Sequence, residues 1–410
     1  MNESNRFFGG RERGVVTVFT AIIFLVAITL VVIFVAQTGI LEQRMSANEI
    51  RMKQTAIAAQ GGVERAMAYM QKNNTPTMFD SNNDGNEQAY RAMFLSLDAA
   101  REPFGGIDDV CPPLPEQFPT EATQNGSFSV DNLREAVILS CGWSDDRSAR
   151  KAIMVSMEAG PALASEATAP LTAVGMLDIR GNVNVYNAYR RELIRTFEVP
   201  EITGGAAELH TRRSETPPPP VTDPVPRPDD PIYDDVRSVR GDDNETAEDE
   251  ISIFTDPALR NENDDFFERF MGLNKTAYRD TMVAHEIEGQ GNSAISIEPD
   301  RWGQVIWVEG NARLDESVGT RDNPVVLVVN GDLTTRGNFD EFHGILYVVG
   351  NIEARGNPEF YGSVIVEGAV EDSEVSGTPR FVFDPLAANR AANSGIRAQV
   401  SGSWRDWVSN

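Results

Sequence analysis

The sequence predicts an α+β protein in which a long amino-terminal helix packs on a small antiparallel sheet, followed by a parallel β-solenoid-like region. Three observations predict this fold class. Val15 to Ala36 carries no charge, short strand-like runs follow within residues 73–160, and glycines recur at steps of six or seven between Gly331 and Gly368.

The apolar run from Val15 to Ala36 is long enough to cross a bilayer. At about 1.5 Å per residue, a helix of this length spans the hydrocarbon layer of roughly 30 Å. Arg6, Arg11 and Arg13 precede it, so the positive-inside bias places the amino end in the cytoplasm and the rest of the chain outside. An ordinary cleaved signal peptide has a shorter apolar region of about 7–15 residues.

The helix is predicted to continue beyond the apolar run, so that residues 15–72 form one element. Apolar and small side chains recur at steps of three, four or seven and make one stripe, with the charged residues off it. The stripe includes Leu41, Met45, Met52, Ala59, Val63, Ala66 and Met70. Asn73 to Pro76 ends the helix, and a sheet is the expected partner of the stripe.

Residues 73–160 are predicted to form that partner, a small α/β head with antiparallel strands near Glu135–Trp143 and Ala149–Glu158. The chain has two cysteines, Cys111 and Cys141. In an exported protein we expect a disulfide between them, worth about 3–4 kcal/mol in the chain-entropy model. Two buried free thiols are the alternative.

A short acidic stretch within the head resembles part of a calcium loop. Asp80, Asn82 and Asp84 alternate ahead of Gly85, as the first ligands of such a loop do. Arg91 stands at the twelfth position, where a bidentate acid is expected. Calcium is therefore the one candidate cofactor, and an Asx-rich surface turn is the simpler interpretation.

The glycine series near the carboxyl end predicts a solenoid over residues 256–410. Val328 to Asn338 and Val348 to Asn357 repeat one another at an offset of 19 residues. Such a coil is typical of a parallel β-solenoid, and an antiparallel meander with glycine at its turns is the alternative. Leu171 to Asn187 has the same Arg-Gly-Asn turn, so residues 161–211 are a connector or the start of the solenoid.

Residues 212–255 differ in composition from both neighbours. Pro217 to Pro231 is rich in proline, and Gly241 to Glu250 is rich in acid. This composition predicts an exposed linker or insertion that acts as a spacer, with a proline-rich ligand for a partner as the alternative.

The charge balance argues against nucleic acid as a partner, because the formal net charge is −26. His210, His285 and His343 have no neighbour at a metal-ligand spacing. Some solenoids are polysaccharide-acting enzymes, but scattered acids in so acidic a chain are weak evidence for a site. We expect no enzymatic activity and no catalytic residue.

The amino-terminal segment resembles that of PilX-type minor pilins of type IV pili. The likeness lies in Gly14, the apolar helix directly after it, and Thr38 to Met70, while Gly402 to Trp407 resembles the end of long members. It implies a prepilin leader at residues 1–14, cleavage between Gly14 and Val15, and N-methylation of Val15. The helix would be anchored in the inner membrane before it packs among other major and minor pilins.

The resemblance also implies where the subunit lies. Major pilins carry glutamate as the fifth residue of the mature chain, and Phe19 stands there in this sequence. A subunit without that charge fits pilus initiation or the tip, in contact with a tip adhesin or assembly-platform proteins. The implied location is the inner membrane of a Gram-negative bacterium with the carboxyl-terminal part periplasmic, and later the pilus fibre at the cell surface.

Two other interpretations stay open. The chain could be a minor pseudopilin of type II secretion. It could also be an uncleaved, membrane-anchored solenoid that acts as an adhesin or enzyme on envelope polysaccharide.

Overall fold

The structure is a computed structural model. It describes residues 13–73, 77–80, 89–96, 100, 106–112, 135–175, 177–180, 183–197, 201–203, 207–213, 215–227, 230–233, 237–239, 253–260, 265–291, 293–336, 339–368 and 373–408.

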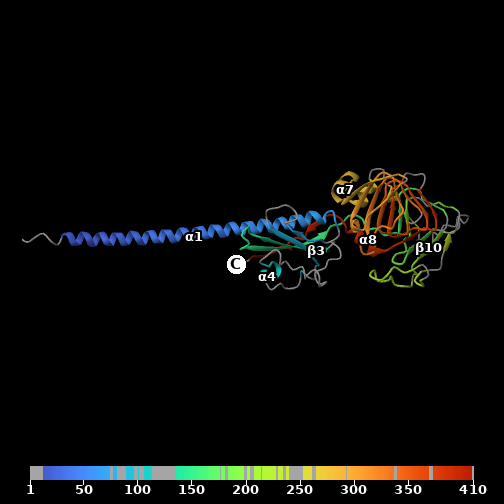
Figure 1. The fold of residues 1–410 in the computed structure, drawn as a ribbon. Helices are drawn as coiled ribbons and strands as arrows, with labels where there is room; N and C mark the ends of the chain where they lie inside the picture. Colours follow the sequence, from blue (N-terminus) through green and yellow to red (C-terminus); the bar gives the residue numbers. More distant parts are fainter. Residues whose placement is uncertain are drawn as a thin grey trace, which may run out of the picture.

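The molecule is elongated, with a rod-like helix, a small head and a solenoid following one another (Figure 1). The rod is α1, Arg13–Met70, a single helix as the sequence predicts. Its first half stands free, and its second half lies along the sheet of the head. The predicted stripe explains the difference, because Ala59, Val63, Ala66 and Met70 are buried against the sheet.

The head is an antiparallel sheet, here called the head sheet, whose strands follow the order β1-β2-β3-β4-β24 with β25 also paired to β4. The strands are β1 Phe79–Asp80, β2 Tyr90–Ser96, β3 Glu135–Trp143, β4 Arg150–Ala159, β24 Arg397–Gln399 and β25 Arg405–Val408. The predicted strands at β3 and β4 are confirmed. A short helix, α4 Ile107–Val110, lies against β4.

The carboxyl-terminal residues correct one predicted boundary. The sequence predicts solenoid throughout residues 256–410, but β24 and β25 return to the head and pair with β4. The return path runs antiparallel to the outgoing chain, since Gly160 N donates to Ile396 O (2.9 Å) and Gly395 N donates to Gly160 O (3.0 Å). The head and the solenoid are therefore joined by two chain segments.

The solenoid has two main sheets of parallel strands, and the predicted parallel architecture is confirmed with about 7 turns. Among the described residues, one sheet runs β14-β16-β18-β20-β22-β6-β9 and the other runs β11-β10-β7-β23-β21-β19-β17-β15-β13. The strands of the first sheet are β14 Ala294–Ile295, β16 Ala312–Leu314, β18 Leu333–Thr335, β20 Ile352–Gly356, β22 Ser373–Gly377, β6 Leu177–Arg180 and β9 Glu201–Thr203.

The second sheet contains longer strands and one antiparallel pair, β10 with β11. Its strands along the path are β11 Arg237–Val239, β10 Ala207–Thr211, β7 Asn184–Asn187, β23 Arg380–Val382, β21 Glu359–Val366, β19 Glu341–Val348, β17 Val325–Asn330, β15 Val305–Glu309 and β13 His285–Glu288. A branch leaves this path at β21: β5 pairs with β21, β8 pairs with β5, and β12 pairs with β8. These strands are β5 Leu171–Ala173, β8 Ile194–Thr196 and β12 Ile253–Thr255.

The strand register reproduces the sequence repeat. Leu333 pairs with Ile352 and Val325 pairs with Gly344, both at the predicted offset of 19 residues. The stacking order differs from the chain order, because β5 and β6 stack on β21 and β22. The earliest coil in the sequence therefore lies beyond the latest one, and residues 171–211 belong to the solenoid.

Helices cover one outer side of the longer sheet. They are α6 Phe266–Met271, α7 Lys275–Met282 and α8 Pro385–Ala392, with short 3₁₀ turns η2 Pro257–Leu259 and η3 Pro299–Arg301 elsewhere. Phe267 and Tyr278 of α6 and α7 pack on Trp307 and Tyr347 of the sheet. Inside the coils, valine, leucine and isoleucine side chains from both sheets form a separate core.

Candidate functional site

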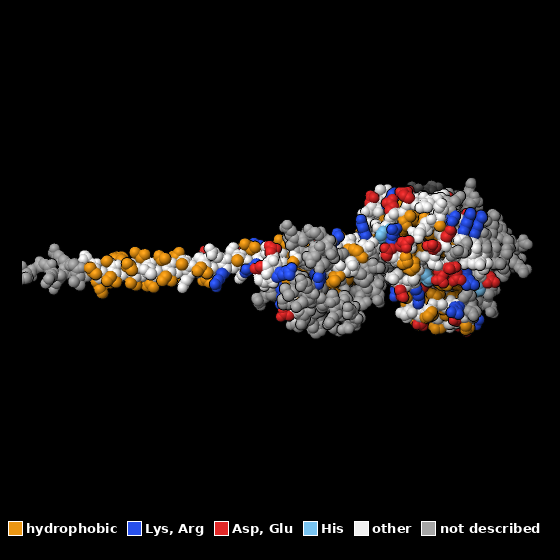
Figure 2. Space-filling model, viewed as in Figure 1, with side chains coloured by type: hydrophobic (Ala, Val, Ile, Leu, Met, Phe, Trp, Pro, Cys, Tyr) orange, Lys and Arg blue, Asp and Glu red, His pale blue; other side chains and the backbone are white. Residues whose placement is uncertain are grey.

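The free half of α1 exposes large apolar side chains to the surroundings (Figure 2). Phe19, Phe24 and Phe34 are 65%, 68% and 69% exposed. Among the described residues, α1 is the one helix long and apolar enough to cross a membrane. Such a surface is stable in lipid or in a bundle of similar helices, and unstable in water.

The predicted processing site lies at the start of this helix. The α1 backbone is helical from Arg13, so Gly14 and Val15 fall in its first turn. Phe19 lies one turn further on and is exposed. The side chains of residues 13–16 are outside the described part, so cleavage and methylation stay predictions.

The second half of α1 packs on one face of the head sheet. A disulfide lies on the opposite face. Cys111 and Cys141 are bonded, with their Cα atoms 5.7 Å apart, which confirms the predicted pair. Cys111 follows α4, and Cys141 lies in β3. The bridge therefore holds the α4 segment against the central strands, beside the buried Trp143.

The calcium hypothesis concerns residues at the end of β1 and beyond. Asp80 is the last residue of β1, but its side chain, Asn82 and Asp84 lie outside the described residues. Within the described ranges no group of three or more histidine, cysteine or acidic side chains could hold a metal ion. Calcium binding at this loop stays a prediction.

The proline-rich segment lies on the solenoid surface. We call residues 215–233 the strap; positions 215–227 and 230–233 are described. Arg213 N donates to Ile232 O (3.0 Å), and Val225, Ile232 and Tyr233 pack against the solenoid strands. Of the two predicted interpretations, linker or insertion, the strap is an insertion between coils, and it packs back onto them instead of acting as a free spacer.

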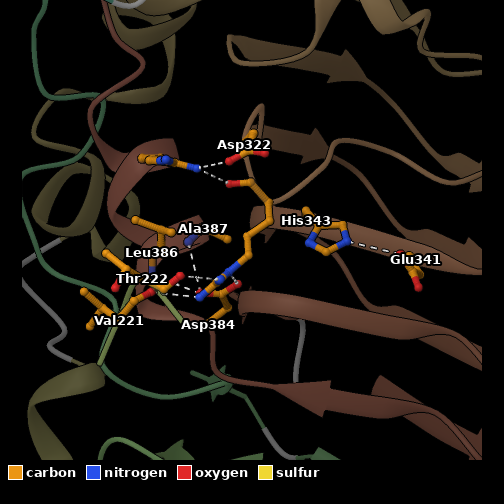
Figure 3. A network of polar contacts seen from close by, with 10 residues as sticks. Val221, Thr222, Asp322, Glu341, His343, Asp384, Leu386 and Ala387 are labelled. Carbon is orange, nitrogen blue, oxygen red and sulfur yellow. Dashed lines mark hydrogen bonds and ion pairs between the residues drawn. The ribbon is translucent and has the colours of Figure 1, made fainter. Parts of the chain in front are cut away.

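Arg321 holds the middle of the strap through hydrogen bonds (Figure 3). The Arg321 guanidinium donates to the carbonyl oxygens of Val221 (2.8 Å) and Thr222 (3.4 Å). The same group donates to Asp384 Oδ2 at 2.7 Å. The Asp384 carboxylate is fully buried and accepts the Leu386 and Ala387 N–H groups at the start of α8. Arg321 thus links the strap to a helix N-terminus.

The strap covers the end of a ladder of side chains on the outer face of five strands. Strand register aligns His343, Tyr361, Val382, Tyr186 and His210 in that order. His343 stacks on Tyr361 with ring centroids 4.8 Å apart, and Tyr186 stacks on His210 at 4.3 Å. Tyr233 of the strap meets Tyr186 edge-on at 5.6 Å.

Sequence reasoning missed this ladder and the contact with the strap. The only sequence signal for the ladder is that His343 and Tyr361 hold equivalent positions in consecutive coils. Tyr186 and His210 precede the main glycine series, so their coils carry little of the repeat that would align them.

Burial lowers the pKa of His210 from its usual value, and the nearby Glu208 carboxylate opposes this shift. Within the described part of the chain, His210 Nε2 has no hydrogen-bond partner, and Glu208 Oε2 lies 3.6 Å away. The folded protein thus favours the neutral ring. The stability that depends on a neutral His210 is present above the pKa of histidine in the unfolded chain, about 6.5. It is lost as pH falls below that value, because the unfolded chain then binds the proton more readily.

We expect the free energy of unfolding of the solenoid to decrease between about pH 7.5 and pH 5, and to decrease less in His210→Phe. Phenylalanine keeps the stacking on Tyr186 but binds no proton. Urea unfolding at several pH values measures this slope. The matched variant Glu208→Gln removes the charge that favours protonation, so its slope should be steeper. Equal slopes in all three proteins would contradict this assignment.

Comparison with known proteins concerns chiefly α1. The PilX N-terminal family profile matches residues 13–64. The amino-terminal segment is therefore similar to that of PilX-type minor pilins. This match and the exposed apolar half of α1 fit a membrane-anchored pilus subunit.

Beyond the PilX-type segment the comparisons add little. No curated protein matches the chain. Among solved structures, the competence-associated pilin ComZ from Thermus thermophilus aligns over 88% of this chain and 98% of that chain, with 10% identity and a TM-score of 0.23. A TM-score this low does not establish a shared fold.

Proposed function

We propose that the protein is a minor pilin that lies at or near the tip of a type IV pilus and helps to prime its assembly. The observation that carries this proposal is the PilX-type helix whose first half is apolar and exposed along its length. That half would lie in the inner membrane first and then among the helices of major and minor pilins. The proposed role is structural and not enzymatic.

The shape of the molecule supports the tip position. The solenoid lies beyond the head, at the end of the molecule opposite the free half of α1 (Figure 1). Stacked helices in a shaft bring neighbouring heads close together, and a solenoid on each subunit would crowd them. Phe19, in place of the glutamate of major pilins, supports the same position. A tip adhesin, an assembly-platform protein or a surface is the proposed contact of the solenoid.

The proposed maturation begins with cleavage between Gly14 and Val15 in the cytoplasm of a Gram-negative bacterium, followed by N-methylation of Val15. Arg6, Arg11 and Arg13 support this orientation, because positive residues stay on the cytoplasmic side. The head and solenoid would then be periplasmic, where the Cys111–Cys141 disulfide can form.

We expect Gly14→Glu to abolish cleavage and to remove the protein from purified pili, because an uncut leader keeps charged residues at the amino end of the helix that must enter the bundle. Mass spectrometry of the native amino terminus measures cleavage, and immunogold labelling of pili measures position. Gly10→Glu, in the same leader, is the matched control and should be cut normally. An intact Met1 on the wild-type protein would refute the pilin proposal. Labelling along the whole shaft would refute the tip position alone.

A further inference from the structure

A cleft of about 200 Å³ lies at the joint between the head and the solenoid. Its walls come from residues 71–72 directly after α1, from residues 281–284 at the end of α7 and just before β13, from Gln304, and from the return segment at residues 394–397. Because the residues after α1 and the return segment line the cleft together with solenoid residues, a ligand in this cleft would touch both parts of the molecule.

The charges around the cleft are unusual for this chain. Two of the lining residues, Lys72 and Arg397, are cationic and none is acidic, although the chain has a net charge of −26. No described side chain pairs with the Lys72 ammonium group, whereas Arg397 donates to the carbonyl oxygens of Met70 and Asn73. The Arg397 guanidinium thereby offsets the negative end of the α1 dipole.

Gln304 supplies an independent observation. It lines the cleft and is only 2% exposed. Its Oε1 lies 2.9 Å from Nε2 of His285, so the amide nitrogen points away from that ring. Within the described residues this Nε2 has no acceptor. A buried N–H₂ group without an acceptor is destabilising, so an acceptor from outside the chain would be favoured.

We propose that the joint cleft binds a small oxyanion, of the phosphate or carboxylate class, between Lys72, Arg397 and Gln304. The anion accepts the free N–H groups of Gln304 and is held by the two cations, which are the groups that recognise such ligands elsewhere. A bound anion ties the segment after α1 to the coil at the β13 end of the solenoid and stiffens the joint. This inference is independent of the proposed place in a pilus.

Isothermal titration of the full chain in detergent tests the site, with sodium phosphate added at constant ionic strength and pH 7. We expect a dissociation constant of about 1 mM or lower. Lys72→Met and Gln304→Leu should each weaken binding by about tenfold or more. Lys53→Met is the matched control, because Lys53 lies on α1 away from the cleft and pairs with Glu49, and it should bind as the wild type does.

Hydrogen exchange supplies a second readout that reports on the joint itself. The amides of Gly160 and Gly395 hydrogen-bond across the two connecting segments, and phosphate should slow their exchange in the wild type but not in Lys72→Met. A parallel titration with sodium acetate distinguishes the two classes of oxyanion. If only phosphate binds, the ligand is a free phosphate. If acetate binds as well, the site also accepts a protein carboxylate. No heat with the wild type, or equal binding by Lys72→Met, would overturn the proposal.

Discussion

Replacing Gly344 by valine is expected to destabilise the solenoid by about 4 kcal/mol and to lower its unfolding temperature by roughly 10 °C. Gly344 lies in β19 with φ of +134°, a conformation that β-branched residues rarely adopt. A Cβ there would overlap the backbone of Val325, its partner on the neighbouring coil. The bend of the coil and the spacing between coils both need glycine at this position.

Gly356→Val separates the cost of positive φ from the cost of overlap with the neighbouring coil. Gly356 also has positive φ, at +92°, but a Cβ there meets nothing within 4 Å. This variant should therefore lose only the conformational part, about 1–3 kcal/mol. Thermal unfolding of the full chain in detergent, followed by circular dichroism, measures both. Equal losses in the two variants would show that close coil stacking at Gly344 contributes nothing.

The elements with a strong local pattern could be predicted from the sequence. The uncharged run from Val15 predicted α1, and the offset of 19 residues predicted the register of Leu333 with Ile352. A short strand-like run followed by turn residues also placed β3 at Glu135–Trp143. For β3 and the coils, the residues that form the pattern are the ones buried in the fold, so the pattern and the packing have the same cause. The apolar run of α1 is exposed instead, and its length and composition alone predict the helix.

The remaining features depend on contacts between distant residues. Nothing in residues 397–408 shows that they pair with β4, because three or four strand-like residues fit any open edge. The composition of the strap predicts an exposed spacer, because proline and acid cannot build a core. In its middle the strap is held by hydrogen bonds from Arg321 to its carbonyl oxygens. Every sequence has such carbonyl oxygens, and Arg321 lies about a hundred positions further along the chain.

For the same reason, only part of the candidate site could be predicted from the sequence. The exposed apolar face around Phe19 follows from composition alone, and the pairing of Cys111 with Cys141 follows from there being two cysteines. The joint cleft joins Lys72, Gln304 and Arg397 from three distant segments, so the sequence holds no local pattern for it.

Replacing Arg321 by methionine is expected to have a similarly large effect, a loss of about 3–5 kcal/mol, and to release the strap. The variant leaves the fully buried Asp384 carboxylate without its cation, and an unpaired buried charge is costly. It also removes the donors to Val221 and Thr222. Hydrogen exchange at the amide of Asp223, which donates to Pro220 O, should become faster as the strap detaches.

Two further variants separate the buried charge from the attachment of the strap. Arg321→Met combined with Asp384→Asn removes the unpaired charge but keeps a side-chain acceptor for α8, so most of the stability should return while the strap stays loose. Arg390→Met breaks the neighbouring pair with Asp322, which is 85% exposed, and should cost less than about 1 kcal/mol. If the strap amides of Arg321→Met exchanged as slowly as in the wild type, Val225, Ile232 and Tyr233 would be sufficient to hold it, and Arg321 would stabilise only α8.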